Sequence, residues 1–317
     1  MASFKFKNIY LSESSTISGI NEKINTKFSF PDYFNGEKTS EDAEVKMQSM
    51  VIKDILKRNS VDLLLSADLS NQIGTSNKTA SHFELSHLGL YSACASYAEG
   101  LIVAGSVLSS AANLHSACVA VSSHNLAAER TFRYPIEYGS PRRVTQTFTA
   151  TGAVASVVTK NPTSMKIESA TIGKVIDFGV KDANNMGAIM APSAAETIME
   201  HFNDTKRSPD YYDVILTGDL GKLGSELMYD ILAKNDITLK NHIDAGSELI
   251  VDKTLTDQGA SGPVCLPLYL VEKILKDRKY KKVLIIGTGA LQNQTLVNQK
   301  KTLPSVSHAV SIEVIDK

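Results

Sequence analysis

Cys94 is the residue whose chemistry depends most on its place in the chain. It stands in the run Ser92-Ala93-Cys94-Ala95-Ser96, after a strand-like stretch at 88–91 and before an apolar helical stretch. A cysteine at such a turn lies beside the N–H groups of a helix N-terminus, which lower a thiol pKa and bind an oxyanion. The pattern allows a thiol nucleophile, but free cysteines are also among the most buried residues. Packing is therefore the alternative for Cys94, and it is the favoured interpretation for Cys118 and Cys265.

The densest cluster of polar and aromatic residues lies at 122–139. Arginine forks bind carboxylates through paired hydrogen bonds and aromatic rings stack on flat ligands, so this composition favours a site for a planar anion. His124 follows a predicted strand, where α/β folds place ligands. The alternative is a solvated loop in which Arg130 and Arg133 pair with Glu129 and Glu137. The candidate ligand-binding residues are Cys94, His124, Asn125, Arg130, Phe132, Arg133, Tyr134, Tyr138 and Asp219.

Asp219 belongs to an internal repeat. The run VDLLLSADL at 61–69 matches YDVILTGDL at 212–220, which places Asp68 opposite Asp219. Both aspartates follow a predicted strand, so either could serve a site, although capping of the next helix is the more common role for Asp there. The histidines show no metal-ligand spacing, and we expect no metal and no cofactor.

The elements around these residues also repeat. An amphipathic helical pattern precedes each copy, and the second one follows a capping box at Ser193 and Glu196. Two further apolar runs, at 118–123 and 282–287, also follow helical stretches, and such runs indicate parallel strands buried on both faces. We therefore predict an α/β fold with two similar halves, 1–160 and 161–317, that share one core and form a site at their interface.

Composition limits the class of partner. The 317 residues include 33 Lys and Arg against 34 Asp and Glu, a net charge of −1, which excludes a global attraction to nucleic acid or anionic lipid. Any anionic ligand must then be held by a few local groups, and recruitment to a membrane is expected through a protein partner.

Three cysteines without a CxxC pair argue against a disulfide framework and indicate a reducing compartment. The N-terminus lacks the apolar segment of a secretory signal. The stretch 101–121 has no formal charge but is rich in Ala and Ser, so we interpret it as buried in a soluble protein and not as a membrane span.

The sequence resembles the stage V sporulation protein AD family, within the thiolase-like superfamily. The turn around Cys94 is common to the superfamily, and the run SSHNLAAERTFRYPIEYGSPRRVTQTFTATGA at 122–153 is specific to the family. The similarity extends from Asp42 to His308. This resemblance implies a five-layered αβαβα thiolase-like fold, which is commonly found in dimeric proteins.

The resemblance also implies a function. Members look like cytoplasmic proteins, of the forespore or mother cell, peripheral at the spore inner membrane, where integral membrane proteins of the same transport system are their partners. The family is associated with moving dipicolinate (pyridine-2,6-dicarboxylate, which also forms a calcium chelate) into the developing spore. Dipicolinate is a planar dianion, the kind of ligand that the 122–139 cluster favours. The same likeness implies a homodimer.

Differences between this sequence and the superfamily pattern indicate whether the protein is an enzyme or a binding protein. A condensing enzyme needs a His and an Asn, or a second His, from the second half to stabilise a thioester oxyanion. Alignment of this sequence with the superfamily pattern puts Gly218 at the position of the His and Ala260 at that of the Asn. An alignment shifted by one residue would put Asp219 at the position of the His. Loss of one such donor costs on the order of 10²- to 10³-fold in rate. We therefore expect a non-catalytic protein, with acyl transfer by Cys94 as the alternative.

Overall fold

Each half of the chain contributes strands in the same order to one large sheet. The computed structural model describes residues 2–132 and 142–315. From one edge, the first half supplies β5 (Ser86–Gly89), β4 (Leu63–Ala67), β6 (Ser116–Ser123), β8 (Gly152–Thr159) and β2 (Tyr10–Ser18). From the other edge, the second half supplies β11 (His242–Asp244), β10 (Val214–Thr217), β13 (Lys282–Ala290), β14 (Ser305–Val314) and β9 (Met165–Ile172).

The pairing within the two halves is also the same. β4 runs parallel to β5 and β6, and β10 runs parallel to β11 and β13. β8 and β14 then pair antiparallel with β6 and β13. The halves meet where β2 pairs with β9, and β1 (Ala2–Lys5) and β3 (Phe28–Ser29) extend the sheet beside them. The predicted boundary near residue 160 falls in the turn between β8 and β9.

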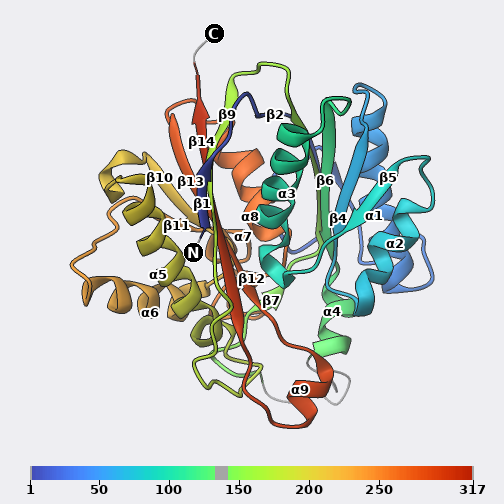
Figure 1. The fold of residues 1–317 in the computed structure, drawn as a ribbon. Helices are drawn as coiled ribbons and strands as arrows, with labels where there is room; N and C mark the ends of the chain where they lie inside the picture. Colours follow the sequence, from blue (N-terminus) through green and yellow to red (C-terminus); the bar gives the residue numbers. More distant parts are fainter. Residues whose placement is uncertain (1, 133–141, 316–317) are drawn as a thin grey trace.

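Helices cover both halves and fill the space between them (Figure 1). α1 (Ser40–Leu56) and α2 (Gly74–Ala80) lie on the outer side of the first half, and α5 (Met186–Thr205) and α6 (Gly221–Ala233) on that of the second. α3 (Ser96–Ser110) and α8 (Cys265–Tyr269) lie between them and pack into a core with side chains from both halves. The layers follow the predicted αβαβα order.

The repeat therefore corresponds to β4 and β10, each preceded by a long outer helix. The helical pattern before the first copy predicts a shared face of Met47, Val51, Ile52, Ile55 and Leu56; on α1 the first four are buried, and Leu56 is partly buried against the same core. The predicted helix start at Ser193 is wrong, because α5 begins at Met186 with Asn185 as its N-cap and continues through Pro192. Ser193 instead donates to the Met190 carbonyl oxygen, within the helix. Burial of the apolar face of α5 outweighs the breaking tendency of proline.

The uncharged stretch 101–121 forms most of α3 and the start of β6, and both are largely buried. Within residues 2–132 and 142–315, no helix has both the length and the apolar character needed to cross a bilayer. The stretch is therefore part of the core, as the sequence predicts.

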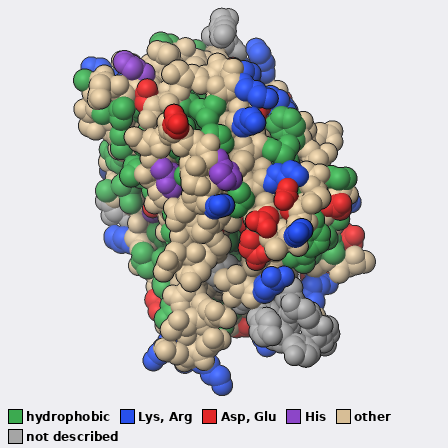
Figure 2. Space-filling model, turned by 90° about the vertical axis from the view of Figure 1, so that its right-hand side faces the viewer, with side chains coloured by type: hydrophobic (Ala, Val, Ile, Leu, Met, Phe, Trp, Pro, Cys, Tyr) green, Lys and Arg blue, Asp and Glu red, His purple; other side chains and the backbone are tan. Residues whose placement is uncertain are grey.

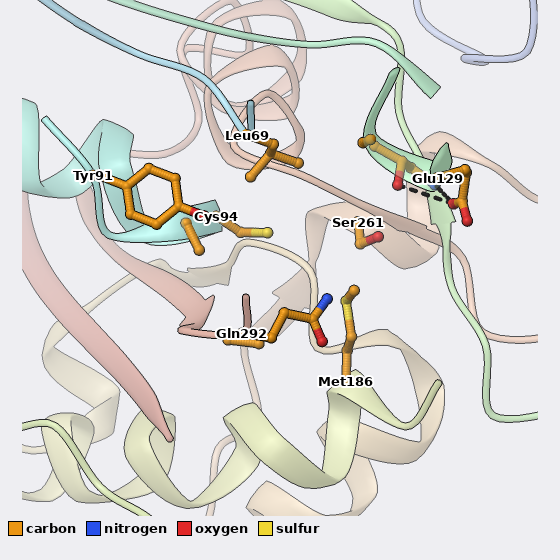
Figure 3. A pocket seen from close by; sticks show the side chains of 11 residues that line it. Leu69, Tyr91, Cys94, Glu129, Met186, Ser261 and Gln292 are labelled. Carbon is orange, nitrogen blue, oxygen red and sulfur yellow. Dashed lines mark hydrogen bonds between the residues drawn. The ribbon is translucent and has the colours of Figure 1, made fainter. Parts of the chain in front are cut away.

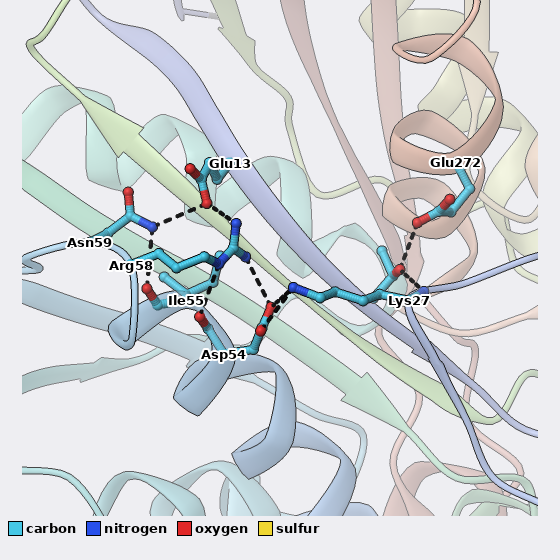
Figure 4. A network of polar contacts seen from close by, with 8 residues as sticks. Glu13, Lys27, Asp54, Ile55, Arg58, Asn59 and Glu272 are labelled. Atoms are coloured by element: carbon cyan, nitrogen blue, oxygen red, sulfur yellow. Dashed lines mark hydrogen bonds and ion pairs between the residues drawn. The ribbon is translucent and has the colours of Figure 1, made fainter.

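A polar network fixes the N-terminal strands to both halves (Figure 4). The Thr16 hydroxyl of β2 donates to Glu272 Oε1 of the second half at 2.6 Å, while Lys27 Nζ binds Asp54 of α1 at 2.7 Å. Burial acts to raise the pKa of Asp54, but hydrogen bonds from Lys27 and Arg58 outweigh it and lower that pKa. The ionised Asp54 therefore holds Lys27 against α1, while the Thr16–Glu272 hydrogen bond joins β2 to the second half.

Candidate functional site

Cys94 lies in a short helical turn at 93–95, immediately before α3. Ala93 has a positive φ of 52°, which is uncommon for a residue with a Cβ. Ser96 supports the turn, because its Oγ accepts from the Ser92 N–H at 3.0 Å and donates to the Ala93 carbonyl oxygen at 2.7 Å. The Cys94 side chain is thereby held inside the protein, where the residue is 6% exposed.

Two glycines of β13, in the second half, allow this turn to approach the sheet. A Cβ at Gly289 would overlap the Ser92 carbonyl oxygen, and one at Gly287 would lie 2.7 Å from the Ala98 Cβ. The Gly287-Thr288-Gly289 run is therefore a packing surface for the Cys94 turn. Glycine is needed there because the two backbones are so close.

The side chain of Asp219, from the second half, lies next to the Cys94 thiol. Its side chain forms a hydrogen bond with Cys94, and its oxygens accept from the Gly262 N–H at 2.9 Å and the Thr288 hydroxyl at 2.7 Å. Burial raises the pKa of Asp219 to about 7, although these three hydrogen bonds act to lower it. Its repeat counterpart Asp68 instead accepts N–H groups of Ser70 and Ser76 near α2, so the two equivalent aspartates serve different purposes.

A small cavity lies against Cys94 at the interface of the halves (Figure 3). Its volume is about 20 Å³, which holds roughly one water molecule. We call it the inner cavity. No histidine is among the described residues that line it, which are Leu69, Tyr91, Ala93, Cys94, Ala128, Glu129, Thr149, Met186, Ser261, Ala290 and Gln292.

Two polar side chains reach the inner cavity from opposite halves. Glu129 of α4 (Asn125–Phe132) accepts from the Thr149 hydroxyl at 3.1 Å. Gln292 follows β13 and points toward the cavity, where its Oε1 is buried without a hydrogen-bond partner among the described residues. The cavity therefore combines a thiol, a carboxylate and an unsatisfied amide oxygen.

A larger pocket of about 550 Å³ adjoins the inner cavity. We call it the outer pocket, and its volume lies within the range of small-molecule sites. Leu69 and Tyr91 line both spaces. The described lining of the outer pocket consists of hydroxyl, amide and apolar side chains without a formal charge, namely Leu69, Ser70, Asn71, Gln72, Ile73, Tyr91, Thr131, Asn293, Gln294, Thr295 and Leu296.

Tyr91 separates the two spaces and is 43% exposed. Burial, with smaller contributions from Cys94 and Asp68, raises the pKa of its hydroxyl to about 12. The hydroxyl therefore stays protonated at physiological pH and can donate to a ligand carboxylate. The exposed ring offers a flat surface for stacking.

Asn125 begins α4 and His124 immediately precedes this helix, but neither residue is among the described lining of the two spaces. His124 Nε2 is 2.7 Å from the Tyr33 carbonyl oxygen, and its ring lies near Tyr33 and Phe34. Burial lowers the pKa of His124, which favours the neutral imidazole. Asn125 Nδ2 donates to the Thr149 carbonyl oxygen at 3.1 Å, so this residue positions α4 against the inner cavity.

The remaining predicted residues belong to the end of α4 and beyond. Arg130 is exposed and lies 3.7 Å from Glu41 of α1, and Glu137, its partner in the loop alternative, lies outside the described residues. The side chain of Phe132 and the whole of Arg133, Tyr134 and Tyr138 lie outside the described residues. Of the nine candidates, the structure brings together Cys94 and Asp219.

The other cysteines are fully buried in the core. Burial raises the pKa of Cys118 to about 12 and that of Cys265 well above the ordinary value. Both thiols therefore stay protonated and pack as small apolar groups. In the described part of the chain, no cluster of three or more His, Cys, Asp or Glu side chains could hold a metal ion.

The sequence contained a signal for two lining residues that our prediction missed. Tyr91 follows the end of β5 and Gln292 follows the end of β13, and α/β folds place ligands at such strand ends. Met186 and Ser261 carry no comparable signal. They reach the cavity only because α5 and the pairing of β12 (Ala260–Ser261) with β7 (Phe148–Thr149) bring them there.

Comparison with known proteins identifies the family of this chain. The model of the family described as stage V sporulation protein AD matches residues 3–313. The stage V sporulation protein AD of Bacillus subtilis (strain 168) is 36% identical over 319 residues, which cover 96% of this chain and 94% of that protein.

Solved structures of condensing enzymes share the fold. The 3-oxoacyl-[acyl-carrier-protein] synthase III of Aquifex aeolicus VF5 aligns with a TM-score of 0.59 at 13% identity, covering 96% of this chain and 99% of that one. A variant of OleA from Xanthomonas campestris gives 0.63 at 11% identity, covering 98% and 99%. At such identities the likeness supports the thiolase-like fold alone.

Proposed function

Because the chain belongs to the stage V sporulation protein AD family, we propose that its role in sporulation is to bind dipicolinate without catalysis, for uptake into the developing spore. The observation that carries the proposal is the ligand-sized outer pocket, whose described lining offers a tyrosine ring with hydroxyl and amide groups, next to the inner cavity that Cys94 lines.

The outer pocket is the proposed ligand site. The inner cavity has room for roughly one water molecule and is bordered by Glu129, which would repel a dianion. In the outer pocket, the Tyr91 ring can stack on the pyridine ring while hydroxyl and amide groups donate to the carboxylates. Hydroxyl and amide groups suit a ligand without net charge, so we propose the neutral calcium chelate as the bound form.

The partner of Cys94 supports a binding role. Condensation requires hydrogen-bond donors aimed at the oxygen that gains negative charge in the transition state. Asp219 lies beside the thiol and, when ionised, can only accept hydrogen bonds and would oppose that charge. The described lining of the inner cavity also contains no histidine.

Acyl transfer by Cys94 is the competing function. The observation that favours it is the position of Cys94 at the start of α3 in a fold shared with condensing enzymes. Incubation with acyl-CoA followed by intact-protein mass spectrometry tests it. An adduct that is lost in Cys94→Ser but kept in Cys118→Ser would support acyl transfer, and no adduct is expected.

Isothermal titration calorimetry tests the binding proposal. Free dipicolinate and its calcium chelate are titrated separately into about 100 μM protein, which detects dissociation constants tighter than about 1 mM. Benzene-1,3-dicarboxylate, which lacks the ring nitrogen that chelates calcium, is the matched control ligand. We expect the calcium chelate to bind most tightly; absence of heat with both forms of dipicolinate would reject the assignment.

Assembly is part of the same proposal. We propose that the protein forms a homodimer and acts with integral membrane proteins of the sporulation transport system. β5 lies at the edge of the sheet, and an unpaired edge strand can pair with a second copy. Sedimentation velocity would test the dimer.

A further inference from the structure

Two loops lie side by side at the end of the molecule that carries α9 (Gln294–Asn298) (Figure 1). Ile176 and Ser305 exchange a pair of backbone hydrogen bonds of 2.8 Å each, and the Leu303 N–H donates to the Val180 carbonyl oxygen at 2.8 Å. The Thr302 hydroxyl donates to Asp177 at 2.5 Å. The segments 174–181 and 300–305 therefore form one surface, which we call the paired-loop surface.

Large apolar side chains of this surface face solvent. Val175 is 62% exposed and Phe178 is 64% exposed, whereas apolar residues beside them, such as Leu303, are buried. Val144 is also exposed. Its neighbour Arg143 forms an ion pair with Asp182, which directly follows the segment 174–181. An exposed phenylalanine and an exposed valine on one loop, with a further exposed valine next to Arg143, indicate a surface that is covered in the working protein.

The same surface has an excess of positive charge. Lys174, Lys181, Lys300 and Lys301 are exposed, and none forms an ion pair with a residue that the structure describes. Of the nearby acids, Asp177 accepts from Thr302 and Gly179, and Asp182 pairs with Arg143. The chain as a whole has a net charge of −1, so this local excess is a feature of the surface and not of the composition.

We propose that the paired-loop surface binds an anionic lipid bilayer. Lysines attract anionic headgroups, at roughly fivefold in partition coefficient for each lysine near the surface. Phe178 and Val175 can enter the boundary between headgroups and acyl chains, where apolar side chains are favoured. Lys300 and Lys301 follow α9, whose residues line the outer pocket, so this contact would bring the pocket close to the bilayer.

Lysines elsewhere provide a matched comparison. Lys53 of α1 and Lys57, the C-cap of this helix, are exposed and line a groove on the side of the molecule that faces the viewer in Figure 2. This side shows basic and acidic side chains interspersed. That groove contains Lys46, Lys53, Lys57 and Lys78 but also Glu37 and Asp42. It lacks an aromatic side chain as exposed as Phe178.

The experiment is co-sedimentation of the full chain with lipid vesicles. Vesicles of equal parts phosphatidylglycerol and phosphatidylcholine are compared with pure phosphatidylcholine, without dipicolinate, so that the result is independent of the proposed ligand. The wild type should bind the anionic vesicles and not the neutral ones. The double variant K300E/K301E should weaken binding at least about tenfold. The single variant Phe178→Ser should weaken it about fivefold or more, and this loss should persist in high salt.

The control is K53E/K57E, which makes the same charge change on α1 and should retain binding. Thermal melts establish that all variants are folded. Three results would overturn the proposal: no binding of the wild type to anionic vesicles, an equal loss in K53E/K57E, or unchanged binding in K300E/K301E. Binding to native membranes but not to anionic vesicles would assign the surface to a protein partner and would also overturn it.

Discussion

The Cys94 thiol and the Asp219 carboxyl group are joined by a hydrogen bond across the interface between the two halves of the chain. The thiol comes from the turn before α3 and the carboxyl group from the end of β10. Neither half could form this pair alone. The pair places a carboxyl group beside the thiol that lines the inner cavity, and the ionised form of that group would oppose the negative charge that condensation develops.

Replacing Asp219 by Asn should change the pH dependence of stability. The pKa of Asp219 is about 7 in the folded protein against an ordinary value of 3.8. Between these values the unfolded chain has lost the proton that the folded protein keeps, so the free energy of unfolding falls as pH rises from about 4 to 7. Asp219→Asn should flatten this fall, as measured by urea denaturation at several pH values. An unchanged slope would contradict the raised pKa, and Asp210→Asn, at an exposed position, is the control.

The three cysteines should differ in their reactivity with iodoacetamide. Cys94 borders a cavity, whereas Cys118 and Cys265 are fully buried with raised pKa values. Since the thiolate is the reactive form, Cys94 should be modified first and the other two only after unfolding. Peptide mass spectrometry measures the order, and protein in guanidinium chloride serves as the control in which all three react. Modification of Cys265 before Cys94 would contradict the described packing.

Tyr91 should contribute to dipicolinate affinity in two separable ways. Tyr91→Ala removes the ring and should weaken binding by about tenfold, which corresponds to roughly 1.4 kcal/mol for a stacking contact. Tyr91→Phe keeps the ring but removes the donor hydroxyl, and a smaller loss of about threefold to tenfold is expected. Calorimetry measures both, with Tyr229→Ala, a partly exposed tyrosine on α6, as the control. Equal affinities for wild type and Tyr91→Ala would place the ligand elsewhere.

Gly289→Ala should destabilise the Cys94 turn. The added methyl group would overlap the Ser92 carbonyl oxygen, so β13 and the turn must separate. We expect a loss of about 1–3 kcal/mol in the free energy of unfolding and faster alkylation of Cys94. The control is Gly74→Ala in α2, where the new Cβ would lie 3.4 Å from Ser70 Oγ and should be tolerated. Retention of full stability in Gly289→Ala would show that the close approach is not required.

Local pattern was enough to predict two similar α/β halves, whereas the five-layered order came from the resemblance to the thiolase-like superfamily. The matching runs around Asp68 and Asp219 specify two β4-like strands, and the apolar faces of α1 and α5 specify helices that cover them. These properties depend on residues close together in the chain, so they are visible in a single sequence. The start of α5 was predicted wrongly because its burial against the sheet overrides the local signal of Ser193.

The tertiary structure alone settles which side chains meet. Asp68 and Asp219 occupy equivalent positions in the repeat, yet one binds backbone N–H groups and the other binds Cys94. Likewise, His124 follows a strand as a ligand residue would, but its side chain turns toward Tyr33. Such choices depend on the packing of segments that lie far apart in the chain, and neither residue type nor spacing records them. The raised pKa of Asp219 arises in the same way, because it requires burial at an interface that exists only when both halves have folded together.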